Sequence, residues 1–186
     1  MVAHFLCFLN RDGVCMTLIY PGSFDPITLG HIDIAMRGAK IATTLVVAVL
    51  HNPEKKPLFT LDERVRLLKN ELGSISNIDI CSFDGMLVEL AAEKGATAIL
   101  RGLRGISDFE AETNLAIYNK LLSDTNVETV FLVADALHTH VSSSGAKEVA
   151  SLIYGNNLCD NPLDTVVSKN VKNALKQKFS RHRAVR

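Results

Sequence analysis

Apolar, strand-like segments alternate with amphipathic segments along almost the whole chain. The strand-like segments are rich in β-branched residues and lie at 16–20, 43–50, 77–82, 97–100 and 127–133. Segments with the helical spacing of apolar residues lie between and after them, at 29–39, 60–72, 86–94, 106–122, 142–152 and 164–179. Thr60 and Glu63 have the spacing of a capping box, which predicts the start of the second of these helices. Because strands joined through helices run parallel, this alternation predicts one Rossmann-like, doubly wound parallel sheet of the α/β class with C-terminal helices. Ligands of such folds bind at the carboxyl ends of the strands.

The length of the chain favours a single domain. Its 186 residues, 47% of them hydrophobic, can bury one sizeable core. We expect this domain to span residues 16–180, because the first convincing strand begins at Met16. Residues 1–15 are then a disordered or mis-started extension, and residues 181–186 are a flexible basic tail.

Net charge and cysteine spacing exclude several classes of function. The formal net charge of +0 gives no general attraction for polyanions, so we expect neither nucleic acid nor a membrane among the partners. One alternative is that the basic segment 169–186 binds a polyanion, which a steep salt dependence of binding would reveal. The four cysteines lack C-x-x-C spacing, which argues against a zinc site or disulfides and favours a reducing, cytoplasmic location.

The segment 20–31 (YPGSFDPITLGH) runs from a strand through a Gly/Pro-rich turn into a helix. We expect residues 21–22 and 25–26 to break the strand and His31 to lie in the first helical turn, where free N–H groups and the helix dipole attract anions. Thr28 and His31 are three residues apart and therefore share a face of the helix. A cap or a surface residue is the simpler interpretation of a lone histidine, but the glycine and hydroxyl neighbours favour a phosphate site.

Two further loops carry cations to the same edge of the predicted sheet. Lys55 lies between two prolines in the loop that follows the second strand. Solvated charge is the usual interpretation of such a lysine, whereas its place at a strand end favours a phosphate contact. Arg101 and Arg104 follow the fourth strand beside glycines, where their guanidinium groups can each bind two phosphate oxygens.

The helix that follows these arginines begins with several acids, and a serine run precedes a later helix. Acids in a first turn stabilise the helix through its dipole, which is the simplest interpretation of Asp108. For Glu112, a second interpretation is that its carboxylate faces a ribose or a neighbouring subunit. The serines at 142–144 predict a second helix start that binds anions and faces the first, so that both would hold one polyphosphate, and Lys147 adds a charge one turn later.

Taken together, these motifs resemble the bacterial phosphopantetheine adenylyltransferase family. The resemblance covers residues 17–179, and the TLGH element alone is shared by the wider nucleotidyltransferase superfamily. It rests on the segments 22–26 (GSFDP), 28–31 (TLGH), 55–64 (KKPLFTLDER), 101–104 (RGLR), 108–110 (DFE) and 141–148 (VSSSGAKE). The resemblance therefore predicts that residues 16–180 form a nucleotidyltransferase domain.

The resemblance implies a reaction and a set of binding residues. The family transfers an adenylyl group from ATP to 4′-phosphopantetheine and releases dephospho-coenzyme A and pyrophosphate, in coenzyme A synthesis. In this resemblance, the residues that match the family's acceptor site, and are therefore expected to contact 4′-phosphopantetheine, are Ser23, Lys55, Leu87 and Arg101. The resemblance also predicts that ATP is bound by Ser23, Phe24, His31, Gly102, Leu103, Arg104, Glu112, His138, Thr139, His140, Val141, Ser142, Ser143 and Ser144.

The expected mechanism is an in-line attack in which positioned cations and N–H donors stabilise the transition state. We predict this role for His31, Lys55 and Arg104, while Ser23 orients the incoming phosphate. Family members use Mg²⁺ and form homohexamers, so we expect both here, and we assign no metal-ligating side chain. The chain departs from the family at residues 138–140 (HTH), where relatives carry an aromatic residue that packs on adenine.

Two other functions remain as alternatives at this point. The first is a different nucleotidyltransferase, such as a nicotinamide-mononucleotide adenylyltransferase or a cytidylyltransferase, which a panel of acceptors would separate. The second is a nucleotide-binding module without catalysis. The joint presence of His31, Lys55 and Arg104 argues against it, because binding alone does not need that full set.

Overall fold

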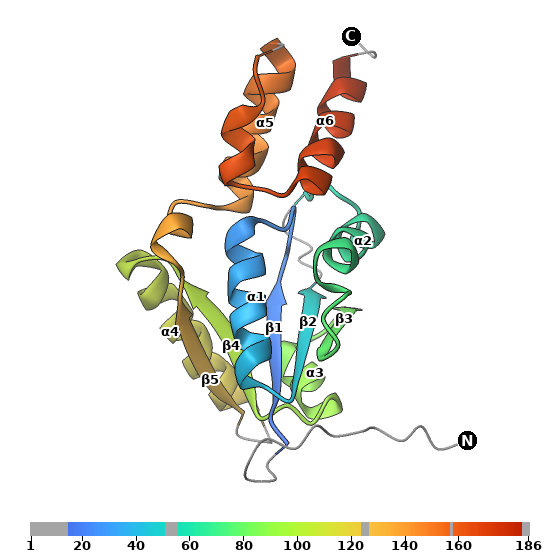
Figure 1. Cartoon of the computed structure of the whole chain (residues 1–186). Coiled ribbons are helices and arrows are strands. Elements are labelled where there is room, and N and C mark those ends of the chain that lie inside the picture. The colour runs from blue at the N-terminus through green and yellow to red at the C-terminus, as the bar shows by residue number, and fades with distance from the viewer. Residues whose placement is uncertain (1–14, 51–55, 124–126, 157, 184–186) are drawn as a thin grey trace, which may run out of the picture.

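The structure, a computed structural model, describes residues 15–50, 56–123, 127–156 and 158–183. It contains one five-stranded sheet in which every neighbouring pair of strands is parallel (Figure 1). The strand order is β3-β2-β1-β4-β5, which is the order of a doubly wound sheet and confirms the predicted α/β class. The strands are β1 (Thr17–Gly22), β2 (Thr44–Leu50), β3 (Ile78–Phe83), β4 (Ala98–Leu103) and β5 (Glu128–Val133).

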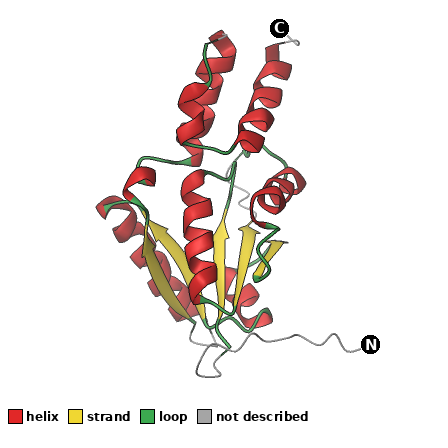
Figure 2. Ribbon diagram, viewed as in Figure 1, coloured by secondary structure: helices red, strands yellow, loops and turns green. Residues whose placement is uncertain are grey.

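Helices cover both faces of this sheet, and two more project beyond its carboxyl edge (Figures 1 and 2). Each described crossover between strands of the sheet contains a helix, as parallel pairing requires. The helices are α1 (Leu29–Ile41), α2 (Leu61–Leu72), α3 (Leu87–Glu93), α4 (Ile106–Leu122), α5 (Ser143–Asn156) and α6 (Lys169–Arg183). Short 3-10 turns at Ala136–His138 and Asn161–Thr165 precede α5 and α6.

The hydrophobic core has two parts, one on each face of the sheet. Alternate residues of the central strands divide between them, so Leu18 of β1 belongs to the larger part and Ile19 to the smaller. The larger part joins the sheet to α1, α2, α5 and α6, and Leu175 of α6 is fully buried there. Because α5 and α6 contribute to the main core, the C-terminal helices belong to the same domain as the sheet.

The start of α2 confirms a local signal in the sequence. The Thr60 hydroxyl accepts the N–H of Glu63 at 3.3 Å, and the Glu63 carboxylate accepts the N–H of Thr60 at 2.8 Å. This reciprocal pair is a capping box, which satisfies two N–H groups that the first helical turn leaves free.

The predicted limits of β1 and of the last helix were wrong. Residues 21–22 do not break β1, because Pro21 and Gly22 continue its register with Ala48 and Val49 of β2. The register of β1 with β4 covers only Leu18 and Ile19, so at Pro21 the strand has a single partner and tolerates the missing N–H. The last helix begins at Lys169 rather than at 164, since a 3-10 turn fills Asn161–Thr165, and it ends at Arg183 rather than at 179.

Residues 1–14 and 184–186 lie outside the described part, so the extension expected at 1–15 and the end of the basic tail stay predictions. Among the described helices, none is long and apolar enough to cross a membrane.

Candidate active site

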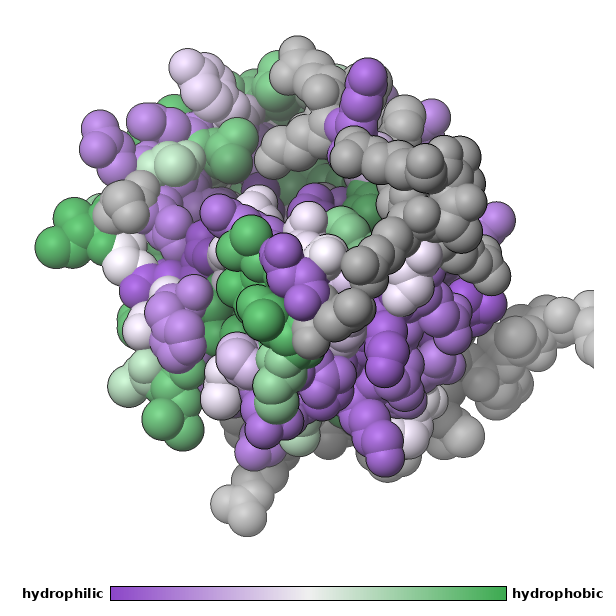
Figure 3. Space-filling view, turned by 90° about the horizontal axis from the view of Figure 1, so that it is seen from above, coloured by the Kyte–Doolittle hydropathy of each residue, from purple (hydrophilic) through white to green (hydrophobic). Residues whose placement is uncertain are grey.

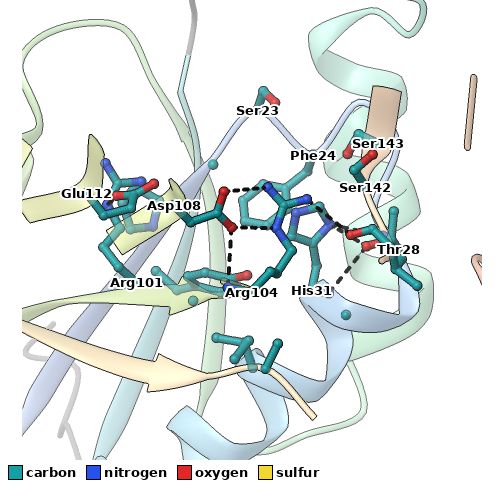
Figure 4. Close-up of a pocket in the computed structure, with 18 of the residues that line it drawn as sticks. Ser23, Phe24, Thr28, His31, Arg101, Arg104, Asp108, Glu112, Ser142 and Ser143 are labelled. Carbon is teal, nitrogen blue, oxygen red and sulfur yellow. Dashed lines mark hydrogen bonds and ion pairs between the residues drawn. The ribbon is translucent and has the colours of Figure 1, made fainter. Parts of the chain in front are cut away.

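A cavity of about 530 Å³ opens at the carboxyl end of the sheet, between β1 and β4. This is the point where the strand order reverses direction, which is the usual ligand position in a doubly wound fold. The β1–α1 turn forms one wall, the β4–α4 turn forms another, and the segment that leads into α5 forms the third (Figure 4). Viewed from above, hydrophilic and hydrophobic residues are intermixed over this end of the molecule (Figure 3).

The β1–α1 turn is fixed by a buried aromatic ring. Phe24 has a φ of 45°, in the left-handed region that bulky residues rarely adopt, and its side chain is 1% exposed. A Cβ on Gly22 would lie 2.9 Å from the Phe24 ring, so only glycine fits beside it. The ring packs edge-on against Tyr20 and against His31, with centroid distances of 5.5 and 5.2 Å. Packing therefore holds the strained turn in one shape.

His31 caps its own helix and also lines the cavity. Its Nδ1 accepts the N–H of Thr28 at 3.1 Å and lies 2.9 Å from the Thr28 hydroxyl, and that hydroxyl accepts the N–H of His31. Because Nδ1 is an acceptor, the neutral ring carries its proton on Nε2. The cap interpretation of this histidine is thus confirmed, and the same side chain lines the cavity, while its contact with phosphate stays a prediction.

Burial keeps the His31 imidazole neutral. The half-buried ring loses water contact, and this desolvation, with a smaller contribution from the positive charge of Arg104, lowers its pKa from 6.5 to about 4. At neutral pH the ring is therefore a hydrogen-bond donor through Nε2–H and carries no net charge.

In the β4–α4 turn, the two arginines are each paired with a carboxylate of α4 (Figure 4). The Arg101 Nε lies 3.1 Å from the Glu112 carboxylate. The Arg104 Nε donates to the Asp108 carboxylate at 2.9 Å, and its Nη1 donates to the Val141 carbonyl at 3.2 Å. Arg104 thus connects its own turn to the segment just before the serine run.

The serine run forms the start of α5. The Ser142 hydroxyl accepts the N–H of Gly145 at 3.0 Å, and the Ser143 hydroxyl donates to the Pro26 carbonyl at 2.8 Å. The second contact ties this helix start to the β1–α1 turn. The two predicted anion-binding helix starts therefore lie on the same cavity.

Sequence reasoning missed the partly buried ion pair that joins these elements. Asp25 is 5% exposed; its carboxylate accepts the N–H groups of Leu58 and Phe59 at 3.0 and 2.8 Å and lies 2.7 Å from the Lys147 Nζ. Arg64 of α2 donates to the Ser23 carbonyl at 2.8 Å. No local pattern could reveal these partners, because Asp25 and Lys147 are 122 residues apart.

The structure brings most of the predicted site residues to this one cavity. It is lined by Ser23, Phe24, His31, Arg101, Gly102, Arg104, Glu112, His138, Val141, Ser142, Ser143 and Ser144. Four predicted residues do not line it: Leu87, Leu103, Thr139 and His140. Lys55 lies outside the described residues, so its role stays a prediction.

Physical reasons account for the four that do not line the cavity. Leu87 packs against the smaller core at the start of α3. Leu103 is 9% exposed, whereas its neighbour Gly102 lines the cavity. The Thr139 hydroxyl donates to the Ala136 carbonyl at 3.1 Å, and His140 is exposed.

Within the described ranges, no group of three or more His, Cys, Asp or Glu side chains could hold a metal ion. The two α4 carboxylates that line the cavity are both engaged by arginines. Side chains of the described part therefore offer no dedicated metal site.

Comparison with known proteins agrees with this geometry. The Cytidylyltransferase-like family model matches residues 19–149. The phosphopantetheine adenylyltransferase of Heliobacterium modesticaldum is 50% identical over 76% of this chain and 83% of its own. That of Geotalea daltonii is 44% identical over 88% of this chain and 96% of its own.

A solved structure shows the same fold at low identity. Plasmodium falciparum nicotinic acid mononucleotide adenylyltransferase, complexed with NaAD, aligns with a TM-score of 0.60 and 12% identity, over 91% of this chain and 96% of its own. The sequence relatives are far more similar to this chain and share one name. The chain belongs to the phosphopantetheine adenylyltransferase family, within the cytidylyltransferase-like nucleotidyltransferases.

Proposed function

We propose that this protein transfers an adenylyl group from ATP to 4′-phosphopantetheine and releases dephospho-coenzyme A and pyrophosphate, a step of coenzyme A synthesis. One observation carries the proposal: a histidine at a helix start, two arginines and three helix-start serines line the same cavity. Such donors suit a polyphosphate. The relatives' shared name supports the choice of acceptor.

The chemistry requires charge stabilisation rather than a nucleophilic side chain. When the acceptor phosphate attacks the α-phosphorus of ATP, negative charge grows on the equatorial oxygens and on the departing pyrophosphate. Donors that already face these atoms stabilise the transition state without reorganisation. We assign this role to His31, Arg104 and Lys55.

His31 acts as a neutral donor in this scheme. Its Nδ1 is occupied by Thr28, so its orientation is fixed and its Nε2–H is free to donate to an α-phosphate oxygen. A proton on Nδ1 would break the cap, and the low pKa of about 4 keeps that proton away at neutral pH.

The remaining residues bind and orient the two substrates. Arg101 and Ser23 contact the acceptor phosphate, and the serines of α5 contact the triphosphate. Glu112, which holds Arg101 here, faces the nucleoside in this assignment. His138 lines the cavity beside Gly30 and takes the place where relatives carry an aromatic residue.

Mg²⁺ fits this site as a companion of ATP. Mg²⁺ commonly binds substrate phosphates with only one or two carboxylates and several waters, which agrees with the lack of a metal-ligand cluster among the described side chains. When bound, the ion neutralises charge on the polyphosphate.

The α4 side of the molecule supports assembly into the homohexamer of the proposal. Apolar side chains stand exposed along this helix, with Tyr118 at 61%, Leu121 at 76% and Leu122 at 56% exposure. Patches of this kind mark contacts between proteins, and copies of this chain are the proposed occupants. Sedimentation of the wild type and of Leu121→Glu tests this: a hexamer that the substitution dissociates is expected, and a monomeric wild type would contradict it.

The cytoplasmic location is proposed on two grounds. Coenzyme A synthesis needs ATP, and the described cysteines 15, 81 and 159 are free thiols, which suits a reducing compartment.

The experiment that tests the function uses a panel of acceptors. The protein is incubated with ATP and Mg²⁺ plus 4′-phosphopantetheine, nicotinamide mononucleotide or a phosphorylated sugar alcohol, and with CTP in place of ATP. Mass detection of dephospho-coenzyme A with matching pyrophosphate release is expected from the first mixture alone. Faster turnover of another acceptor would reassign the enzyme within the superfamily.

A further inference from the structure

Asp108 lies in the first turn of α4 and faces the cavity, although none of the assigned roles includes it. We propose that Asp108 is a positioning residue, which holds the Arg104 guanidinium across the cavity in the orientation that adenylyl transfer needs. The effect on adenylyl transfer rests on the proposed function, whereas the contact between Asp108 and Arg104 rests on the geometry of the structure.

The contact between Asp108 and Arg104 fixes both backbone and side chain. The Asp108 Oδ2 accepts the Arg104 Nε–H at 2.9 Å and the Arg104 backbone N–H at 3.3 Å. Its Oδ1 accepts from the Arg104 Nη2 at 3.4 Å. Because one carboxylate binds both the backbone N–H and the guanidinium group of Arg104, the guanidinium plane has little freedom to turn.

A second anchor sets the direction in which Arg104 points. Its Nη1 donates to the Val141 carbonyl, which belongs to the wall that leads into the serine run. The guanidinium therefore bridges two walls of the cavity, next to His31 (Figure 4). A guanidinium has five N–H donors, so donors remain for a phosphate oxygen after these contacts.

This pair contributes geometry more than stability. The Arg104 side chain is 42% exposed and that of Asp108 is 26% exposed, and ion pairs at such sites stabilise folds only slightly. An unpaired arginine in the same place would sample many rotamers, and that freedom would have to be lost in the transition state. The carboxylate restricts those rotamers before substrate arrives, which is preorganisation.

Glu110 supplies a matched control. It lies two residues further along α4, carries the same charge near the same helix start, and is exposed. It is absent from the residues that line the cavity in the described part of the chain. The loss of one negative charge from α4 is common to both variants, whereas the contact with Arg104 is specific to Asp108.

The first test observes Arg104 without any turnover. In ¹⁵N-labelled protein, the Nε–H resonance of Arg104, identified by its absence in Arg104→Lys, should exchange slowly with water. In Asp108→Asn that exchange should accelerate about tenfold or more, because a charge-assisted bond becomes a weaker one. Glu110→Gln should leave it unchanged. An unaltered resonance in Asp108→Asn would overturn the proposed contact.

The second test is a double-mutant cycle on turnover. Asp108→Ala alone should lower kcat by about 10- to 10²-fold, and Arg104→Ala by about 10²- to 10³-fold. If Asp108 acts through Arg104, the double variant should match Arg104→Ala within about threefold. Losses that multiply would show that Asp108 acts by another route and would overturn the inference. Asp108→Asn, which preserves shape, takes the place of Asp108→Ala in the cycle if the alanine variant unfolds at a lower temperature.

The ATP affinity separates positioning from a structural role. Asp108→Asn removes a negative charge beside the anion site, so its dissociation constant for ATP, measured by calorimetry, should stay equal or fall while kcat drops. A rise in that constant together with a lower melting temperature would assign Asp108 to stability instead. If the wild type fails to adenylylate phosphopantetheine, the proposed function fails, while the resonance of Arg104 still decides the contact.

Discussion

The β1–α1 and β4–α4 junctions both deliver a polar group to the cavity from a strand, a turn and a helix start, yet they hold it by different means. In the first junction, a buried ring and a capping box fix a neutral histidine. In the second, carboxylates on α4 hold charged arginines that are partly exposed to solvent. Packing fixes a group regardless of salt, whereas exposed ion pairs are screened. The first junction is thus built for rigidity and the second for electrostatic binding.

The largest effect on turnover should come from removal of the His31 donor in the first junction. His31→Ala should lower kcat by about 10²- to 10³-fold, the scale for loss of one transition-state donor. It should also destabilise the fold by about 1 kcal/mol, because the capping box is lost. His31→Gln separates the two effects, since glutamine can serve as the N3 partner of a capping box. Near-normal urea unfolding with the same loss of kcat is expected of His31→Gln, and activity within threefold of the wild type would refute the assigned role.

In the second junction, Arg101→Ala should act on acceptor binding. Loss of a charged hydrogen bond should raise the KM for phosphopantetheine by about 10- to 10²-fold, with a smaller change in kcat. Arg37→Ala is the control, because Arg37 pairs with Asp33 on α1 and does not line the cavity. An unchanged acceptor KM with a weakened ATP affinity would move Arg101 to the nucleotide.

A pair of glycines compares the rigidity of the junctions directly. Gly22→Ala should destabilise the fold by about 1–3 kcal/mol, because its Cβ would lie 2.9 Å from the buried Phe24 ring. Gly105→Ala should be nearly neutral, since nothing lies within 4 Å of a Cβ there and its backbone is extended. Urea unfolding of both variants measures the difference, and equal losses would show that the two turns are equally packed.

The last expected effect is a pH dependence of stability that comes from His31. Its pKa is about 4 in the fold and near 6.5 when unfolded, so between these values the unfolded chain binds more protons. The free energy of unfolding should therefore fall as pH drops from 6.5 toward 4, by at most about 1.4 kcal/mol per pH unit from this group. Urea unfolding of the wild type should show this slope and His31→Gln should lack it. Equal slopes would place the effect elsewhere.

Sequence patterns predicted the alternation of strands and helices because each depends on local spacing of apolar residues. Local chemistry also predicted the Thr60 cap and the shared face of Thr28 and His31. The end of β1 was missed, since proline there is tolerated only because β4 no longer pairs with that part of the strand. The pairing of β1 depends on the arrangement of the whole sheet and cannot be read from the residues of the strand alone.

The site could be predicted as a set of residue types but not as a set of partners. Asp108 lies in the first turn of α4, as interpreted, but the sequence did not show that its carboxylate also accepts a hydrogen bond from Arg104. Asp25 and Lys147 form their pair only when α5 packs beside the β1–α1 turn. Such contacts form only in the folded protein, and no local pattern of residues in the sequence indicates them.

The Thr28–His31 cap limits which residues position 31 can accept. The Nδ1 edge of the ring accepts a hydrogen bond from the Thr28 backbone N–H while the Nε2 edge presents an N–H donor to the cavity, and the rigid five-membered ring keeps the two edges apart. Glutamine and glutamate can do the first task, but their polar atoms lie together at a single tip. Variants that fold well but do not turn over should therefore be common at this position, and selection for stability alone would not recover histidine.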